Sequence, residues 1–314
     1  MFKKRALTGI VILALTIGFF ALRFVSPYIF DVYLGVIALL GVYEISNIHN
    51  KAHKINDTFV LITYPILCYG ALLIVMLNNL SILIFLAIIV LLAVVLFAIC
   101  FVINKCSKAK INKEMVENGV RVSYNSYVKT KSLRDLFLLC YPTLPIISLF
   151  IINHFTNFAK ISTENANLLS TFLLVLIFAT TIMTDTVAYL VGSGIGGKKL
   201  CPKISPNKTI SGAVGGLIGS ILASMLLFFL FALNDGYRAM FLDCNISLIS
   251  CLVFGLIASI FAQCGDIFAS FIKRKNNAKD YGKILPGHGG ILDRVDGLIA
   301  NAFVIVILAL ILFW

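Results

Sequence analysis

Residues 80–103 read LSILIFLAIIVLLAVVLFAICFVI, an apolar run without a single charged side chain. A helix needs about 20 such residues to cross the hydrocarbon core of a bilayer, so this run predicts a transmembrane helix. Eight further apolar segments follow the same pattern, near 6–22, 27–43, 58–77, 134–153, 168–191, 212–233, 246–268 and 296–314. The sequence therefore predicts an all-α, polytopic integral membrane protein with about nine transmembrane helices.

The N-terminal end of this pattern allows more than one interpretation. The first two segments are short, and the kink-prone Ser26-Pro27 pair could join them into a re-entrant hairpin, so eight and ten spans stay as alternatives. Lys3-Lys4-Arg5 precedes the first apolar run, as in a signal peptide. We favour an uncleaved first helix, because no small-x-small cleavage site follows cleanly and more spans come after it.

Composition excludes a soluble globular domain. The 314 residues are 60% hydrophobic and 13% charged, with a mean hydropathy of +1.00. The net charge of +12 is spread between the apolar runs and forms no single patch, which argues against nucleic acid and favours anionic lipid headgroups or phosphorylated substrates. The eight cysteines show no C-x-x-C spacing, so we interpret them as reduced packing residues.

The distribution of basic residues predicts the orientation. With nine spans, 23 of the 26 Lys and Arg residues fall on the side of the N-terminus, and only Arg23, Lys160 and Arg238 fall on the other. Cytoplasmic loops hold the excess of positive charge in membrane proteins. We therefore expect a multi-pass protein of the inner (cytoplasmic) membrane, with a cytoplasmic N-terminus, a periplasmic C-terminus and active-site loops in the cytoplasm.

Residues 1–133 are interpreted as N-terminal membrane helices with a basic cytoplasmic loop, and residues 134–314 as a C-terminal catalytic membrane region, both within one continuous membrane domain. The loop at 104–134 holds eight basic residues. A solvated loop that fixes topology is the favoured interpretation, and specific binding of anionic headgroups is the alternative.

Polar residues in two places point to a site at the cytoplasmic ends of the helices. Asp185 lies near the end of the sixth span, and helical spacing places it on one stripe with Thr181 and Thr184. It could serve a site or only bond a neighbouring helix. The next loop contains GSGIGGKK at 192–199 and SPNKT at 205–209, so its glycines with Lys198, Ser205, Lys208 and Thr209 could cradle phosphate. A flexible connection explains the same residues.

The third group of polar residues is the strongest. Gln263, Asp266, Ser270 and Lys273 follow one another at spacings of three, four and three, which makes one polar stripe on an apolar helix. Asp266 comes 20 residues after Ile246, about 30 Å along a helix, and so reaches the cytoplasmic lip. The last span then begins with further carboxylates and a cation, namely Asp293, Arg294 and Asp296.

Four carboxylates at one membrane lip repel one another unless cations lie between them. Magnesium fits best, because it binds carboxylates together with substrate phosphates, whereas the scattered Cys and four His offer no zinc pattern. We therefore expect Mg²⁺ at Asp185, Asp266, Asp293 and Asp296, with nearby Lys and Arg balancing a polyphosphate.

Residues 270–296 resemble the signature of the phosphatidate cytidylyltransferase (CDP-diacylglycerol synthase) family, S-x-x-K-R-x-x-x-x-K-D-x-G-x-x-L-P-G-H-G-G-x-x-D-R-x-D. Every fixed position is filled across these 27 residues. The upstream T-D-T-x-A-Y and S-P-x-K-T segments are also similar to the family. The resemblance covers the C-terminal half of the chain, and the first 130 residues match in hydropathy alone.

The resemblance implies a reaction that joins CTP and phosphatidic acid into CDP-diacylglycerol and pyrophosphate, in phospholipid biosynthesis. By motif position, Asp266 and Asp293 are then the principal metal ligands and Asp296 a supporting one. The resemblance also implies that phosphate contacts come from basic residues, and that His288 holds a phosphate or stabilises its loop. The catalytic set is Asp266, Asp293, Lys273, Arg274 and His288, and the substrate-binding set is Lys208, Thr209, Ser205, Lys198, Lys279, Asp280 and Arg294.

Three positions depart from the family pattern. Ser211 and Ala269 stand where the family usually has Glu, which weakens any role assigned to those positions, and Gly297 replaces a usual Ser. Two other functions remain as alternatives: a related CTP-dependent enzyme that acts on another lipid, and a membrane transporter. The sequence leaves open a homodimer and an additional monovalent cation such as K⁺.

Overall fold

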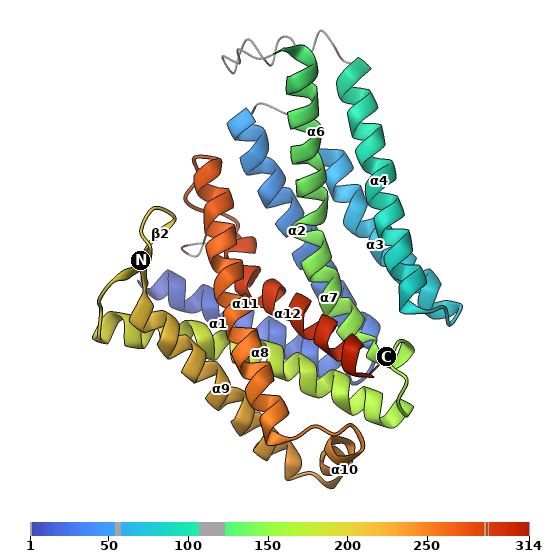
Figure 1. Cartoon of the computed structure of the whole chain (residues 1–314), viewed down its shortest axis with the longest axis vertical. Coiled ribbons are helices and arrows are strands. Elements are labelled where there is room, and N and C mark those ends of the chain that lie inside the picture. The colour runs from blue at the N-terminus through green and yellow to red at the C-terminus, as the bar shows by residue number, and fades with distance from the viewer. Residues whose placement is uncertain (1, 54–57, 107–122, 286, 288, 314) are drawn as a thin grey trace. The chain divides into compact units, whose positions relative to one another are not determined.

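The computed structural model of the chain describes residues 2–53, 58–106, 123–285, 287 and 289–313 (Figure 1). It is almost entirely helical, and each of the nine predicted segments overlaps a helix. The chain forms two compact units. Unit 1 comprises residues 1–16, 32–147 and 276–292, and unit 2 comprises residues 17–31, 148–275 and 293–314.

Unit 1 holds most of the N-terminal helices. It contains the first part of α1 (Phe2–Leu22), most of α2 (Pro27–His53), α3 (Thr58–Leu77), α4 (Ile82–Cys106), α6 (Tyr124–Cys140) and the start of α7 (Thr143–Asn153). Helix α4 packs against α3 and α6. The segment Asn276–Leu292, which carries most of the family signature and is called the signature loop below, also belongs to this unit.

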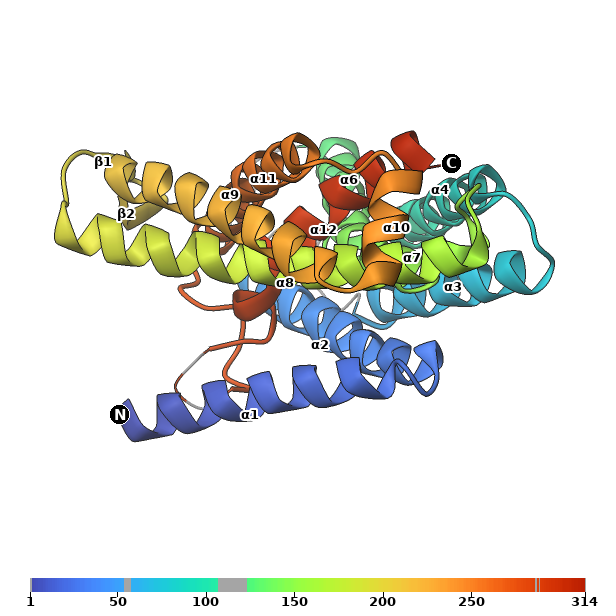
Figure 2. The same cartoon turned by 90° about the horizontal axis from the view of Figure 1, so that it is seen from below.

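Unit 2 holds the C-terminal helices and a small hairpin. It contains η1 (Phe155–Asn157), α8 (Thr163–Gly194), β1 (Lys199–Cys201), β2 (Ser205–Thr209), α9 (Ile210–Ala232), α10 (Asp235–Asp243), α11 (Leu248–Lys275) and α12 (Leu292–Phe313) from Asp293 onward. Helices α8 and α9 run side by side, with the antiparallel hairpin β1–β2 at one end of the pair and α10 at the other (Figures 1 and 2).

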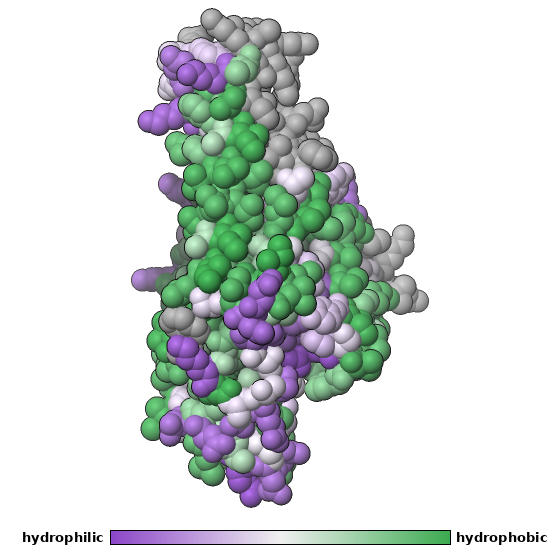
Figure 3. Space-filling view, turned by 90° about the vertical axis from the view of Figure 1, so that its right-hand side faces the viewer, coloured by the Kyte–Doolittle hydropathy of each residue, from purple (hydrophilic) through white to green (hydrophobic). Residues whose placement is uncertain are grey.

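The helices have the length and surface of membrane spans. Within the described residues, seven segments are long and apolar enough to cross a bilayer, and two shorter apolar helices, Thr8–Leu22 and Ile62–Leu77, lie at the other predicted positions. Large apolar side chains are exposed along them, for example Val90 at 62% and Leu222 at 59%. Hydrophobic residues also form broad areas on the face drawn in Figure 3. Such surfaces are rare on soluble proteins. The chain is a multi-pass membrane protein, and nine remains the predicted number of spans.

Close contact between α8 and α9 depends on glycine. A Cβ atom at Gly212 would lie 2.7 Å from the carbonyl oxygen of Ala188, and one at Gly216 would lie 2.9 Å from that of Thr184. No side chain fits at such distances, so the glycine face of α9 lies directly on the backbone of α8. The glycines that follow Thr209 therefore serve helix packing.

Several boundaries differ from the predicted ones. The stretch at 192–211, predicted as a loop, holds the end of α8 and the hairpin. Helix α6 begins at Tyr124, inside the stretch predicted as the basic loop, and the segment predicted at 134–153 is divided between α6 and α7 near Pro142. The short helix α10 was not predicted, because its nine residues are too few and too polar for a span.

A buried polar group lies within unit 2, near the N-terminal part of α8. Arg23 is 8% exposed and donates to the side chains of Asn153, Thr171 and Ser170. Asn153 donates in turn to Asp31 at 2.8 Å, and Asp31 pairs with Nε2 of His154 at 2.6 Å. We call this set the arginine cluster; it consists of Arg23, Asp31, Asn153, His154, Ser170 and Thr171.

Burial has an electrostatic effect on the arginine cluster. It lowers the pKa of the Arg23 guanidinium, and the nearby Tyr237 and Asp31 act against this shift. An arginine stays charged in proteins, so its burial is tolerated only where several acceptors surround it.

Candidate active site

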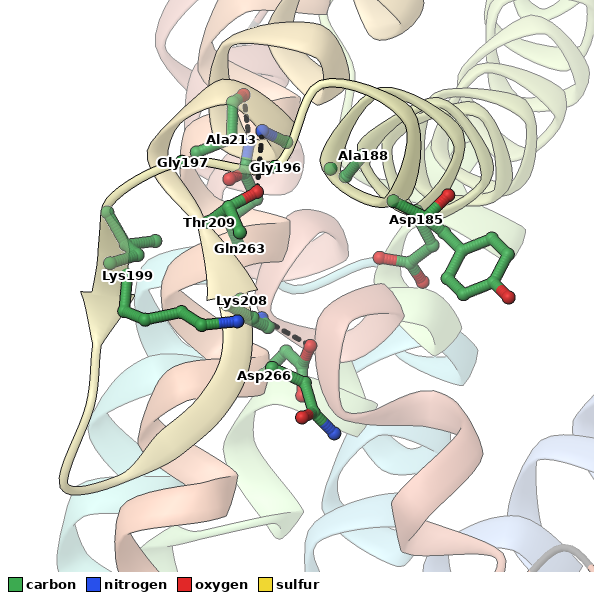
Figure 4. Close-up of a pocket in the computed structure, with 16 residues that line it drawn as sticks. Asp185, Ala188, Gly196, Gly197, Lys199, Lys208, Thr209, Ala213, Gln263 and Asp266 are labelled. Carbon is green, nitrogen blue, oxygen red and sulfur yellow. Dashed lines mark hydrogen bonds and ion pairs between the residues drawn. The ribbon is translucent and has the colours of Figure 1, made fainter.

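A pocket of about 520 Å³ opens in unit 2 between α8, α9, α11 and the hairpin (Figure 4). Helix α8 contributes Asp185, the hairpin contributes Lys199, Lys208 and Thr209, and α11 contributes Asp266. Acidic, basic and glycine residues therefore line one hollow. A pocket of this size and polarity suits a phosphorylated ligand.

Two lysines pair with two of the predicted catalytic aspartates. Lys208 of β2 forms an ion pair with Asp266 of α11 across the pocket (Figure 4), and both side chains are partly exposed. Lys273 of α11 donates to Asp293 of α12 at 2.7 Å, and this carboxylate is 4% exposed. Charged pairs of this kind hold both partners in a defined place.

The other two aspartates lie close to these pairs. Asp185 is exposed and interacts electrostatically with Asp266, Lys208 and Arg294. Asp296 is buried and interacts electrostatically with Asp266 and Asp185 as well as with Lys273. The four predicted carboxylates, called the aspartate cluster below, thus gather with three cations in one part of unit 2.

A glycine lets two of the helices that carry the aspartate cluster approach. A Cβ atom at Gly265 would lie 2.8 Å from the carbonyl oxygen of Asp296 and would collide with Ala300. At Gly297 it would lie 3.2 Å from the carbonyl oxygen of Ala262. Small residues thus bring the backbones of α11 and α12 together, which sets Asp266 beside Asp296.

The hairpin is anchored to the start of α9 by hydroxyl groups. Thr209 caps this helix, because its Oγ1 accepts from the N–H of Gly212 at 3.1 Å. Ser211 donates to the carbonyl oxygen of Gly196, where the backbone has a positive φ of 65°. Ser211, which stands where the family pattern has Glu, therefore ties the glycine turn to the helix that follows it.

Comparison with known proteins agrees with this arrangement. The model of the cytidylyltransferase family matches residues 3–312. The chain belongs to the cytidylyltransferase family. Its membership extends the resemblance from the C-terminal half to almost the whole sequence, including helices that match in hydropathy alone.

Relatives named phosphatidate cytidylyltransferase are similar to part of the chain. The protein of Brucella abortus is 42% identical over 129 residues, 41% of this chain and 43% of the relative. That of Rickettsia bellii is 36% identical over 140 residues, 44% of this chain and 58% of the relative. That of Rickettsia conorii is 34% identical over 183 residues, 57% of this chain and 75% of the relative. The chain thus spans less than half the length of the Brucella relative.

Other residues predicted from the family signature occupy different places. Arg274 is exposed, and its Nε lies 3.4 Å from the carbonyl oxygen of Ile204 in the turn of the hairpin. Ser205 lies in β2, and Lys198 is exposed; Lys199 is the neighbour that lines the pocket. His288 lies outside the described residues, so its role stays a prediction.

Lys279 and Asp280 lie in the signature loop and line a second pocket, of about 650 Å³, within unit 1. Residues of α2, among them Tyr43, Glu44 and Asn47, complete its wall. Residues of the family signature and of a helix from the N-terminal half therefore line the same pocket.

Two amides support the site: Gln263, which the sequence places in the polar stripe with Asp266, and Asn301, which the sequence analysis missed. Asn301, buried in α12, donates to Thr180 at 3.0 Å and Thr181 at 2.9 Å on α8. Gln263 of α11 donates to the carbonyl oxygen of Ala213 on α9 at 3.2 Å. A lone Asn in an apolar helix is the signal that could have found Asn301, since such a group seeks a partner helix.

Proposed function

We propose that this chain transfers the cytidylyl group of CTP to phosphatidic acid and releases pyrophosphate. The supporting observation is the aspartate cluster with Lys208, Lys273 and Arg294, placed in a family whose members in Brucella and Rickettsia are named phosphatidate cytidylyltransferases. A phosphate oxygen of the lipid bonds to the α-phosphorus of CTP, and the bond from that phosphorus to the β-bridging oxygen breaks. The products are CDP-diacylglycerol and pyrophosphate.

The reaction needs positioning and charge compensation more than a covalent intermediate. Lys208 and Lys199 line the pocket, where ammonium groups can bind the phosphates of CTP. Lys273, held against Asp293, and Arg274 and Arg294 at the ends of their helices add positive charge for the departing pyrophosphate. The partly exposed Lys208–Asp266 pair can exchange partners when substrate enters.

Magnesium fits the chemistry of these residues. Mg²⁺ is commonly bound by one or two carboxylates, with water and substrate phosphates as the other ligands. Within the described residues, no three His, Cys, Asp or Glu side chains form a complete ligand set, yet carboxylates lie in electrostatic reach of one another. Asp266 and Asp293 would hold the ion, with Asp296 and Asp185 supporting. Once bound, the ion would neutralise charge that develops on the phosphates.

The proposal places the protein in the inner membrane of a bacterial cell with its pocket toward the cytoplasm, where CTP is available. The relatives named above are bacterial. The excess of Lys and Arg on the side of the N-terminus supports a cytoplasmic N-terminus and a periplasmic C-terminus. A reporter fused after Trp314 would then be periplasmic, and a cytoplasmic reporter would contradict the nine-span topology.

The experiment that tests the function uses the purified full chain in detergent with CTP, phosphatidic acid and Mg²⁺. We expect pyrophosphate release in equal amount to CDP-diacylglycerol, loss of both after chelation by EDTA, and recovery when Mg²⁺ is added back. Replacement of phosphatidic acid by diacylglycerol removes the attacking phosphate and should stop turnover. A monodisperse preparation that stays inactive, beside an active cytidylyltransferase assayed in parallel, would overturn the proposal.

A further inference from the structure

Helix α2 carries a buried carboxylate whose partners lie at the other end of the sequence. Glu44 is 1% exposed. Its Oε1 accepts from the N–H of Ile291 at 3.0 Å, and its Oε2 accepts from the N–H of Leu292 at 2.9 Å. One side chain thus binds two consecutive backbone donors of the signature loop, within unit 1.

These donors lie at the start of α12, which needs a cap from elsewhere. The first N–H groups of a helix have no partner inside the helix, and a polar residue just before it usually supplies one. Here that residue is Ile291, whose apolar side chain accepts nothing. Glu44 takes over this role, and its charge is favourable at the positive end of the helix dipole.

The contact between α2 and the signature loop extends beyond the two hydrogen bonds. Leu292 is fully buried, and its Cδ1 lies over Gly41, one turn before Glu44 on α2. A Cβ atom at Gly290 would lie 2.5 Å from Oε2 of Glu44, and one at Gly282 would lie 2.5 Å from its Oε1. Two glycines of the signature loop therefore leave room for one carboxylate.

The geometry points to Glu44 as a positioning residue for Asp293, the residue that follows Leu292. By fixing the last residues of the signature loop and the first turn of α12, Glu44 sets where α12 begins and which way the Asp293 side chain leaves the helix. A displacement of about 1 Å at a reacting centre can cost about 100-fold in rate. This inference rests on the proposed function only for its effect on turnover.

The first test compares Glu44→Ala and Glu44→Gln with the full-length wild type. We expect kcat to fall about 10- to 100-fold in Glu44→Ala, with the KM for CTP changed less than about threefold, because the position of Asp293 is lost and the pocket is intact. Glu44→Gln keeps one acceptor oxygen of two and should lie in between. A variant with wild-type kcat, or one whose loss is entirely in KM, would overturn the inference.

Hydrogen exchange supplies a readout that does not depend on activity. The amides of Ile291 and Leu292 should exchange at least about tenfold faster in Glu44→Ala than in the wild type, because a released amide is protected less. Unchanged exchange at these amides would also overturn the inference. An inactive wild type would contradict the proposed function, whereas the exchange measurement would still decide whether Glu44 holds the loop.

A double-variant cycle separates positioning from general damage to the fold. Gly290→Ala places a methyl group against the Glu44 carboxylate and should lower kcat about tenfold or more. In the Glu44→Ala background the methyl group finds space, so the same change should cost less than about twofold. Gly35→Ala is the matched control, since its Cβ meets nothing within 4 Å. Equal effects of Gly290→Ala in both backgrounds would refute the contact.

Discussion

Unit 2 contains two polar clusters that are attached to the same helix and differ in character. The arginine cluster includes Ser170 and Thr171 of α8, and the aspartate cluster includes Asp185 of the same helix. Fourteen residues separate Thr171 from Asp185, which is about 21 Å along an α-helix. Each cluster places charged groups in a protein whose surroundings are apolar, and Asp185 and Asp266 of the aspartate cluster line a pocket.

The arginine cluster is closed. Its guanidinium and carboxylate groups are buried, and each is held by several neighbours, as in Arg23 with three side chains and Asp31 with Asn153 and His154. Groups whose hydrogen bonds are made within the protein have few donors or acceptors left to bind a ligand. Their arrangement joins the end of α7, α8 and the segment 17–31, which is a structural role.

The aspartate cluster is open at Asp185 and Asp266, whereas the side chains of Asp293 and Asp296 are buried. Lys208 and Asp266 are 26% and 32% exposed, and Asp185 also faces the pocket. Asp185, Asp266 and Asp296 also repel one another electrostatically. The contrast teaches that partial exposure at a pocket, more than the presence of charge, distinguishes a candidate site in a membrane protein.

The largest expected effect on turnover comes from a substitution in the aspartate cluster. Asp293→Asn removes the negative charge that Lys273 neutralises and a proposed magnesium ligand, and we expect CTP turnover to fall about 10⁴-fold, equivalent to about 5.5 kcal/mol. Pyrophosphate release measures it. Asp235→Asn, at an aspartate that is 94% exposed on α10, is the control and should keep wild-type turnover. Undiminished turnover in Asp293→Asn would remove Asp293 from the site.

A substitution in the arginine cluster should lower the free energy of unfolding and leave turnover unchanged. Arg23→Met keeps the apolar stem and leaves the acceptors of Arg23 buried without their donor, so we expect a loss of about 3–5 kcal/mol in the free energy of unfolding. Thermal unfolding in detergent measures it. The control is Arg238→Met, because Arg238 is 59% exposed and surface pairs contribute about 0–1 kcal/mol. Equal melting temperatures for the two variants would show that the arginine cluster is not structural.

Turnover per folded molecule should be unchanged in Arg23→Met, since the arginine cluster has no part in the chemistry. If Arg23→Met lowered kcat without lowering stability, the arginine cluster would take part in catalysis and the two clusters would not differ in role.

The helices could be predicted because the bilayer imposes their length and apolarity. Their ends could not, since helices continue beyond the hydrocarbon core until capping and turns stop them: α11 was predicted to end at 268 and ends at Lys275. The hairpin was missed because Lys199–Cys201 and Ser205–Thr209 are short and polar, and glycine and lysine in such a stretch indicate a loop.

Part of the candidate site could likewise be predicted from the sequence, and part could not. The aspartates could be predicted from their helical spacing and from the family signature, because carboxylates are costly at a membrane and their positions within one helix follow from periodicity. The partners of Glu44 and Asn301 lie 247 and about 120 residues away in the sequence. Periodicity carries no information on such contacts, so only the tertiary structure reveals them.

The smallest expected effect concerns the Lys208–Asp266 pair, where the aspartate cluster is most exposed. Lys208→Met removes a cation that lines the pocket, and we expect the KM for CTP to rise about tenfold, the equivalent of about 1.4 kcal/mol. Stability should change by less than about 1 kcal/mol, because both side chains of the pair are partly exposed. Steady-state kinetics and thermal unfolding, measured on the same preparation, check the two expectations.

Lys203→Met is the matched control, since Lys203 is an exposed lysine in the turn of the same hairpin and is not among the residues that line the pocket. It should leave both KM and stability as in the wild type. If Lys208→Met instead lowered stability by several kcal/mol with an unchanged KM, the Lys208–Asp266 pair would belong with the arginine cluster as a structural element. The open cluster would then be reduced to Asp185, Asp293 and Asp296, and the hairpin would hold the helices together without binding CTP.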